Sequence, residues 1–159
     1  MELHGLDTET QVCFYEQDFY VLSNFSSFKV WWCESWFDTS EHAYHYSKFM
    51  HDSRHARLLH DIRTALSAHD AFKIAESNKR LVRPDWFDVR ISMMRDILRS
   101  KVACHEYVRR KLLATGDREL VENSWRDDFW GWGSNRDGKN MLGNLWMDIR
   151  AELRAAKAS

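Results

Sequence analysis

The segment TSEHAYHYSKF, residues 39–49, carries the clearest folding signal in the chain. It opens with two small hydroxyl residues, which accept hydrogen bonds from the free N–H groups of a helix start. Glu41 follows as an acid in the first turn, where the helix dipole favours negative charge. Because each helical residue turns by about 100°, Glu41 and Lys48 should lie within about 20° of each other, with Tyr44 and His45 on the same face. We expect a helix that ends near Met50.

This helix face has two interpretations. In the first, the Glu41 carboxylate activates water or stabilises a developing positive charge, and a partly buried Lys48 attacks a sugar aldehyde. In the second, Glu41 only complements the helix dipole and Lys48 is an exposed surface lysine. Spacing alone leaves both interpretations open.

Working outward, the sequence predicts strands over Gln11–Tyr15 and Phe28–Cys33, before the first helix. Several helices should follow, one capped by Ser67 and a long one capped by Asp85. The Ser67 cap opens the helix over residues 68–77, and the remaining expected elements are helices over residues 53–61, 105–114 and 140–154 and a short strand over residues 119–122. We therefore expect an α+β fold, a single compact domain over residues 1–159 that is mainly helical with a small N-terminal β-sheet.

Composition excludes several classes of protein. The 159 residues carry 23 basic and 24 acidic side chains, and no apolar run approaches the ~20 residues that span a bilayer. Three scattered cysteines suit neither a disulfide framework nor a zinc site, so we expect a reduced, cytoplasmic protein with no membrane partner. Residues 79–111 hold ten bases and four acids. This stretch could meet phosphate, or it could neutralise the acidic N-terminal third.

A second group of candidate residues lies in the glycine- and tryptophan-rich loop before the last helix. Asp127 is a candidate acid, Trp130 could stack on a base, and Gly131 would let the backbone approach a ligand. Lys139 and Asn140 stand where the helix begins, so they could hold a phosphate. The alternative is a glycine-rich turn whose tryptophans belong to the core.

Other motifs are weaker. Arg83 could bind phosphate through a bidentate pair and Trp86 could stack on a base, although runs of charge are often only solvated. His51 and His55 have the spacing of a zinc motif, but no third ligand accompanies them, so we expect no metal site. GxGxxG and GxSxG are both absent, which argues against a Rossmann cofactor and a hydrolase elbow.

Taken in order, these motifs resemble the NADAR family over a core of about residues 12–154. The matching elements are Phe14-Tyr15, Ser23-Asn24-Phe25, Thr39-Ser40-Glu41-His42, Lys48-Phe49, Arg83 with Asp85-Trp86, Leu112–Gly116, Leu120–Glu122, Asp127 with Trp130-Gly131, Gly138-Lys139-Asn140, Leu142-Gly143 and Met147–Arg150. Each motif alone is weak, but their order and spacing together are specific.

The resemblance implies hydrolysis of the C–N bond between a ribose and a base, without a cofactor. One family substrate group is the ribosylamino-pyrimidine phosphates of riboflavin synthesis, destroyed as damage control. The other is ADP-ribose on guanine, removed from nucleic acid by an antitoxin activity. The family pattern leaves the choice open and does not indicate an oligomeric state.

Carried onto this chain, the resemblance makes Glu41 and Asp127 the catalytic acids, although Asp128 stands beside Asp127. Lys48 would form a Schiff base with an opened ribose, as an alternative to direct attack by water. His45 stands where the family often has Gln. The expected substrate-binding residues are Ser23, Asn24, Phe25, His42, Tyr44, Arg83, Trp86, Trp130, Gly131, Lys139 and Asn140.

Two further functions remain open on the sequence. A non-catalytic module could bind ADP-ribose or NAD with the same tryptophans and Lys139. A nucleic-acid-binding protein could use residues 79–111, and its affinity would then fall steeply with salt. Retention of both Glu41 and Asp127 favours the enzyme over the binding module. The acidic N-terminal third and the net charge of −1 weigh against the nucleic-acid-binding protein.

Overall fold

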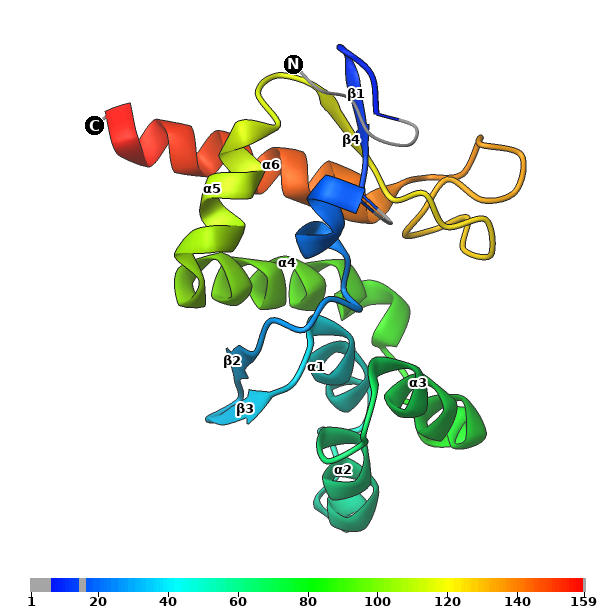
Figure 1. The fold of residues 1–159 in the computed structure, drawn as a ribbon. Helices are drawn as coiled ribbons and strands as arrows, with labels where there is room; N and C mark the ends of the chain where they lie inside the picture. Colours follow the sequence, from blue (N-terminus) through cyan, green and yellow to red (C-terminus); the bar gives the residue numbers. More distant parts are fainter. Residues whose placement is uncertain (1–6, 15–16, 159) are drawn as a thin grey trace. The chain divides into compact units, whose positions relative to one another are not determined.

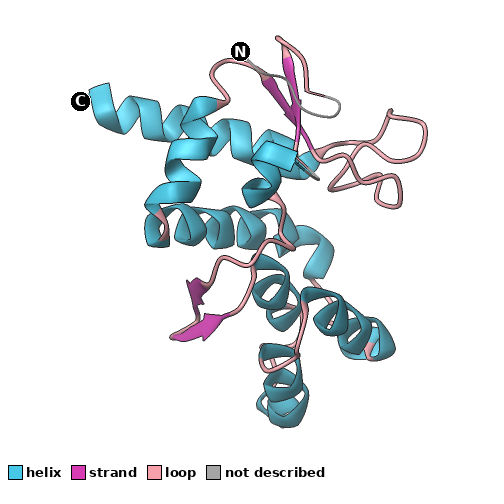
Figure 2. Ribbon diagram, viewed as in Figure 1, coloured by secondary structure: helices cyan, strands magenta, loops and turns pink. Residues whose placement is uncertain are grey.

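Helices dominate the structure, as Figures 1 and 2 show. The computed structural model describes residues 7–14 and 17–158, and these form six α-helices and four short strands. None of the helices in this described part is long and apolar enough to cross a membrane. The chain divides into two compact units, residues 24–105 and residues 1–23 with 106–159. The expectation of a mainly helical α+β fold with little sheet is confirmed.

The unit of residues 24–105 holds the helix expected from the opening segment. In chain order its elements are β2 (Val30–Trp32), β3 (Ser35–Phe37), α1 (Ser40–Ser47), η2 (Ser53–His55), α2 (Ala56–Arg63), α3 (Ala68–Ser77), η3 (Lys79–Leu81) and α4 (Trp86–Cys104). α1 packs against α2, α3 and α4 within this unit. α1 ends at Ser47, earlier than expected, and α3 has the Ser67 cap that the sequence predicts.

The two strands before α1 form a hairpin, where the sequence predicts one strand. β2 and β3 pair antiparallel, with Trp31 opposite Trp36. The two-residue turn between them is Cys33-Glu34, and both residues have positive φ, 49° and 62°. A turn of this kind is usually built from Asn-Gly or similar pairs, so the sequence gives little sign of it.

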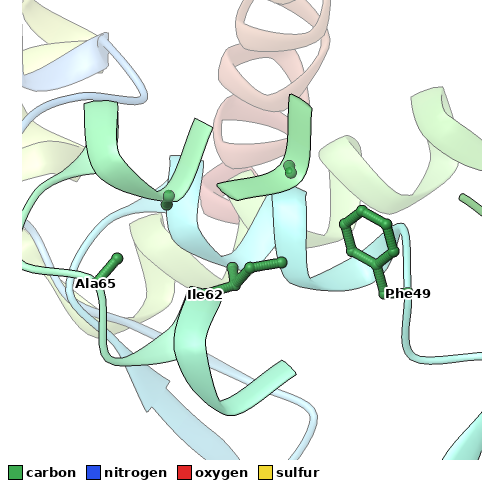
Figure 3. Packing of buried hydrophobic residues seen from close by; sticks show 5 residues of the cluster. Phe49, Ile62 and Ala65 are labelled. Atoms are coloured by element: carbon green, nitrogen blue, oxygen red, sulfur yellow. The ribbon is translucent and has the colours of Figure 1, made fainter. Parts of the chain in front are cut away.

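A hydrophobic cluster holds α1, α2 and α3 together. Its buried members are Phe49, Ile62, Ala65, Ala71 and Ala75. Figure 3 shows the Ile62 side chain between those of Ala65 and Phe49. The alanines of α3 let the helices approach closely, because a small side chain leaves little space between two backbones. This packing fixes the face of α1 that points into the unit.

The other unit is built from segments at both ends of the chain. Its elements are β1 (Gln11–Cys13), η1 (Gln17–Leu22), α5 (Glu106–Ala114), β4 (Glu119–Val121) and α6 (Met141–Ala158). β1 pairs in parallel with β4, with Val12 beside Leu120 (Figure 1). The N-terminal third does form a small sheet, the β2–β3 hairpin, but the first predicted strand pairs with a strand from the C-terminal third. Tyr15 of the predicted strand lies outside the described residues.

Helix α6 packs against β4. Its Trp146 is fully buried, and the indole N–H donates to the Leu22 carbonyl at 2.8 Å. Gly143 lies so close to β4 that a side chain there would overlap the Leu120 carbonyl oxygen. The first turn of α6 can therefore pack this closely against β4 only because residue 143 has no side chain.

Candidate active site

The N-terminus of α1 is fixed by Thr39 and His42. The Thr39 hydroxyl accepts from the His42 N–H at 3.2 Å and donates to His42 Nδ1 at 2.8 Å. His42 Nε2 then donates to the Ala65 carbonyl at 3.0 Å, so both ring nitrogens are engaged and the tautomer follows from its partners. A substrate contact by His42 stays a prediction, and it would require the ring to give up one of these bonds.

Glu41 is almost completely buried at this helix start, with 9% of the residue exposed. Its N–H donates to the Asn24 carbonyl at 3.1 Å, and its Oε1 lies 2.7 Å from His45 Nε2. Burial lowers the pKa of His45, and the attraction of Glu41 offsets this only in part. His45 is therefore a neutral imidazole at neutral pH that donates its Nε2–H to the carboxylate.

Lys48 follows α1 at its C-terminal end and lies over two aromatic rings. Its Nζ is 5.1 Å from the Tyr44 ring centroid and 5.9 Å from that of Trp86, and the two rings are 5.2 Å apart. Burial lowers the pKa of Lys48, Glu41 and Glu76 raise it in part, and Arg90 lowers it further. A lysine in such surroundings has a larger share of neutral amine, the form that acts as a nucleophile.

Arg83 holds the chain before α4 against the end of α1. Its backbone N–H donates to the Lys48 carbonyl at 2.9 Å, and its guanidinium forms a fork with Asp85 at 2.6 and 3.0 Å. This pair lowers the pKa of Asp85 and raises that of Arg83. Asp85 is the N-cap residue of α4, as predicted, but its carboxylate binds Arg83 and makes no capping hydrogen bond to the helix. A substrate phosphate would compete with Asp85 for this guanidinium.

The Ser23-Asn24-Phe25 segment differs in exposure from residue to residue. Ser23 and Asn24 are buried, whereas 41% of Phe25 is exposed. The Asn24 side chain donates to the Met94 sulfur at 3.5 Å, and its Oδ1 has no hydrogen-bond partner among the residues described. A buried amide oxygen without a partner is costly, and this one would be satisfied by a ligand hydroxyl or a water.

The second group of candidates lies in the unit of residues 1–23 and 106–159. Asp127 Oδ1 accepts from the N–H groups of Phe129 and Trp130, at 2.9 and 2.8 Å. The Asp127 carboxylate therefore stabilises the turn of the loop to which it belongs. Gly131 is needed for close approach, since a Cβ there would lie 2.9 Å from the carbonyl oxygens of both Asp127 and Glu122.

Asn140 joins this loop to β4. Its Oδ1 accepts from the Glu122 N–H at 2.9 Å and its Nδ2 donates to the Leu120 carbonyl at 2.8 Å. The residue has a positive φ of 49°, which asparagine tolerates better than most. Lys139 beside it is exposed, and its Nζ lies 5.9 Å from the Phe129 ring. Of these two predicted phosphate ligands, the Lys139 side chain is the more accessible.

The structure thus gathers the predicted site residues in two groups. Residues 24–105 hold Asn24, Phe25, Glu41, His42, Tyr44, Lys48, Arg83 and Trp86; the other unit holds Ser23, Asp127, Trp130, Gly131, Lys139 and Asn140. Sequence reasoning placed His45 on the right helix face but did not include it among the site residues. The i, i+4 spacing from Glu41 was the signal that could have found it. Within the described residues, no three His, Cys, Asp or Glu side chains gather as a metal site.

Known proteins are similar to this chain over most of its length. N-glycosidase Npun_R5314 of Nostoc punctiforme is 36% identical over 138 residues, which cover 87% of this chain and 88% of that protein. N-glycosidase YbiA of Escherichia coli is 32% identical over 151 residues, 94% of this chain and 92% of that protein. The riboflavin biosynthesis protein VVA0006 of Vibrio vulnificus is 36% identical over 147 residues, 91% of this chain but 39% of that protein.

The fold has a solved counterpart. The NMR structure of the E. coli protein YbiA matches with a TM-score of 0.84 at 31% identity, over 97% of this chain and 90% of that one. The NADAR domain model matches residues 13–154, nearly the whole chain. The chain belongs to the NADAR domain family.

Proposed function

We propose that this chain is an N-glycosidase that hydrolyses the C–N bond between a phosphorylated ribose and a base. The observation that carries the proposal is the face of α1, where a buried carboxylate and a lysine with a lowered pKa occur together. Two near-full-length relatives named N-glycosidases support it. We assign the reacting groups to Glu41 and Lys48.

The chemistry follows from these two groups. A ribosylamine opens to an imine between C1 of the sugar and the nitrogen of the base. The neutral Lys48 amine adds to C1 of the imine, and the base then leaves as a free amine as the Schiff base to Lys48 forms. The Lys48 nitrogen loses two protons in this exchange and the nitrogen of the base gains two, and Glu41 accepts each proton and passes it on. Water then adds to the Schiff base on Lys48, which releases the ribose as an aldehyde and restores the amine.

Direct attack by water is the other route through the same face. Glu41 would then remove a proton from water, which adds to C1 as the bond to the base breaks, and would pass this proton to the departing nitrogen of the base. Lys48 would bind substrate only. The two routes differ in whether a covalent bond to Lys48 forms.

For the substrate, we propose the ribosylamino-pyrimidine phosphates of riboflavin synthesis. The support is the match to a riboflavin biosynthesis protein, which contains a segment similar to this chain within a longer protein. These compounds carry the base on an exocyclic amine, which the imine route requires. Arg83 is the cation that we assign to the phosphate, because it lies in the same unit as Glu41 and Lys48. ADP-ribosylated guanine is the second candidate, because it too joins a ribose to a base nitrogen.

A paired product assay by mass spectrometry tests the proposal. One reaction holds the ribosylamino-pyrimidine phosphate and the other an oligonucleotide with ADP-ribosylated guanine. We expect release of ribose 5-phosphate in the first reaction. Release of ADP-ribose with restored guanine, in the second reaction alone, would overturn the substrate choice but keep the reaction. Release in neither, with folded protein that binds ADP-ribose or NAD, would favour the non-catalytic binding module.

A further inference from the structure

The hydrogen bond between His45 and Glu41 is the shortest polar contact that the Glu41 carboxylate makes. His45 Nε2 lies 2.7 Å from Oε1, one helical turn along α1, and both residues are buried. Among the described residues, the side-chain hydrogen bond of Glu41 goes to Oε1, and 11% of the side chain stays exposed. One carboxylate oxygen is therefore held by the protein and the other is left for a ligand.

The opposite side of the His45 ring shows which tautomer is present. Nδ1 is buried and has no hydrogen-bond partner among the described residues. A proton on Nδ1 would be buried without an acceptor, which costs free energy, whereas a bare lone pair there costs less. The ring therefore carries its proton on Nε2, where Glu41 accepts the hydrogen bond.

Aromatic rings restrict the orientation of the imidazole. The Phe72 ring of α3 lies edge to face with it at 5.8 Å and the Tyr44 ring does the same at 5.2 Å. The titratable groups that act on His45 are Glu41, which favours its protonation, and Lys48 and His42, which oppose it. The position, the tautomer and the neutral charge of the His45 ring thus all suit donation of a single N–H to the Glu41 carboxylate.

We propose that His45 is a positioning residue that holds Oε1 of Glu41 through its Nε2–H, so that Oε2 faces the substrate. A neutral donor suits this task, because an imidazolium would bind the carboxylate more tightly and make it a weaker base. A glutamine amide at the same place would supply an equivalent N–H. The inference rests on the proposed role of Glu41 in the reaction.

The test compares His45→Gln with His45→Leu in the full chain. We expect His45→Leu to lower kcat by at least about tenfold, as for the loss of a hydrogen bond to a charged group, with KM within about threefold. We expect His45→Gln to keep kcat within about threefold of the unmodified chain. His55→Leu is the matched control, because His55 lies in the same unit and donates to the Phe49 carbonyl instead. It should leave kcat unchanged.

Two kinetic outcomes would overturn the proposal. One is normal kcat in a folded His45→Leu variant. The other is an equal loss in both variants, with unfolding curves that show both to be folded.

Nitrogen-15 NMR of labelled histidine gives a readout that needs no turnover. We expect His45 at neutral pH to carry its proton on Nε2 and a bare Nδ1. An Nδ1-protonated ring or an imidazolium at neutral pH would overturn the proposal. If the unmodified chain turns over neither substrate, the proposed function fails, and this NMR result alone then decides the assignment of His45.

Discussion

At the scale of single residues, burial acts in the same direction on the two bases beside Glu41. It lowers the pKa of both His45 and Lys48, so both tend towards their neutral forms. A neutral imidazole can orient a carboxylate without protonating it, and a neutral amine can attack carbon. Burial of these two side chains costs free energy of folding, and the same loss of solvent favours the neutral forms that the proposed reaction needs.

Lys48 provides a prediction of pH dependence. Only the deprotonated amine is a nucleophile, so the rate should rise with pH through the Lys48 pKa. Because that pKa is lowered from the usual 10.5, the rise should come at lower pH than for an exposed lysine. Borohydride should trap ribose on the chain during turnover, seen as added mass on a peptide that contains Lys48. Trapping that persists in Lys48→Met would contradict the Schiff-base route.

Asp85 provides a second prediction at this scale. Asp85→Asn removes the charged partner that holds the Arg83 guanidinium, which then becomes freer to bind phosphate. The KM for a phosphorylated substrate should fall severalfold, while that for the dephosphorylated substrate should not change. Equal effects on the two substrates would show that Arg83 does not bind phosphate.

At the scale of elements, the position of glycine decides how α6 meets β4. Gly143→Ala would push a methyl group into the Leu120 carbonyl and the Asn140 amide, which itself binds β4. We expect a loss of at least about 2 kcal/mol in the free energy of unfolding, measured with urea. Gly116→Ala is the comparison, because nothing lies within 4 Å and only its positive φ opposes alanine. It should cost about 1 kcal/mol. An equal or smaller loss for Gly143→Ala would contradict the close packing.

The helices could be predicted from the sequence because their signals are local. The Thr39 cap and the 3.6-residue period place α1 and its face, and Ser67 begins α3 in the same way. Strands β1, β2 and β4 fall within predicted strand segments, but their pairing could not be predicted, because the signals that set it are not local. β1 pairs with a strand from the far end of the chain, and the β2–β3 turn uses Cys33-Glu34 without any glycine.

The candidate site was also predictable where its signals are local and not where they depend on packing. Helical spacing brings Glu41 and Lys48 to one face, and the aromatic residues near them follow from the same period. The Arg83–Asp85 fork escaped prediction because the same Asp85 also suits a helix cap. Which of two partners a side chain chooses depends on the packed structure, and local sequence does not specify it.

At the scale of the whole molecule, the two groups of candidate residues belong to different compact units. Glu41 and Lys48 lie in residues 24–105, and Asp127 and Lys139 lie in residues 106–159. The family match spans both units. Experiments on the reaction should therefore use the full chain.

Cys13 and Cys33 differ in their exposure to solvent. Burial and nearby Asp7 raise the pKa of Cys13 to about 11; partial burial and Glu34 raise the pKa of Cys33 too, but Cys33 is exposed on the β2–β3 turn. Alkylation proceeds through the thiolate, so Cys33 should react well before Cys13 in the native protein. Mass spectrometry of timed samples measures this, and urea should remove the difference. Equal rates in native protein would contradict the burial of Cys13.

The central claim is that Glu41 takes part in the reaction. Glu41→Gln keeps the size of the side chain and removes its ability to accept a proton. Single-turnover release of ribose 5-phosphate, with substrate affinity measured in parallel, tests the claim most directly. The account predicts a rate at least about 10²-fold lower with affinity little changed and the fold intact. Release at close to the unmodified rate would contradict it.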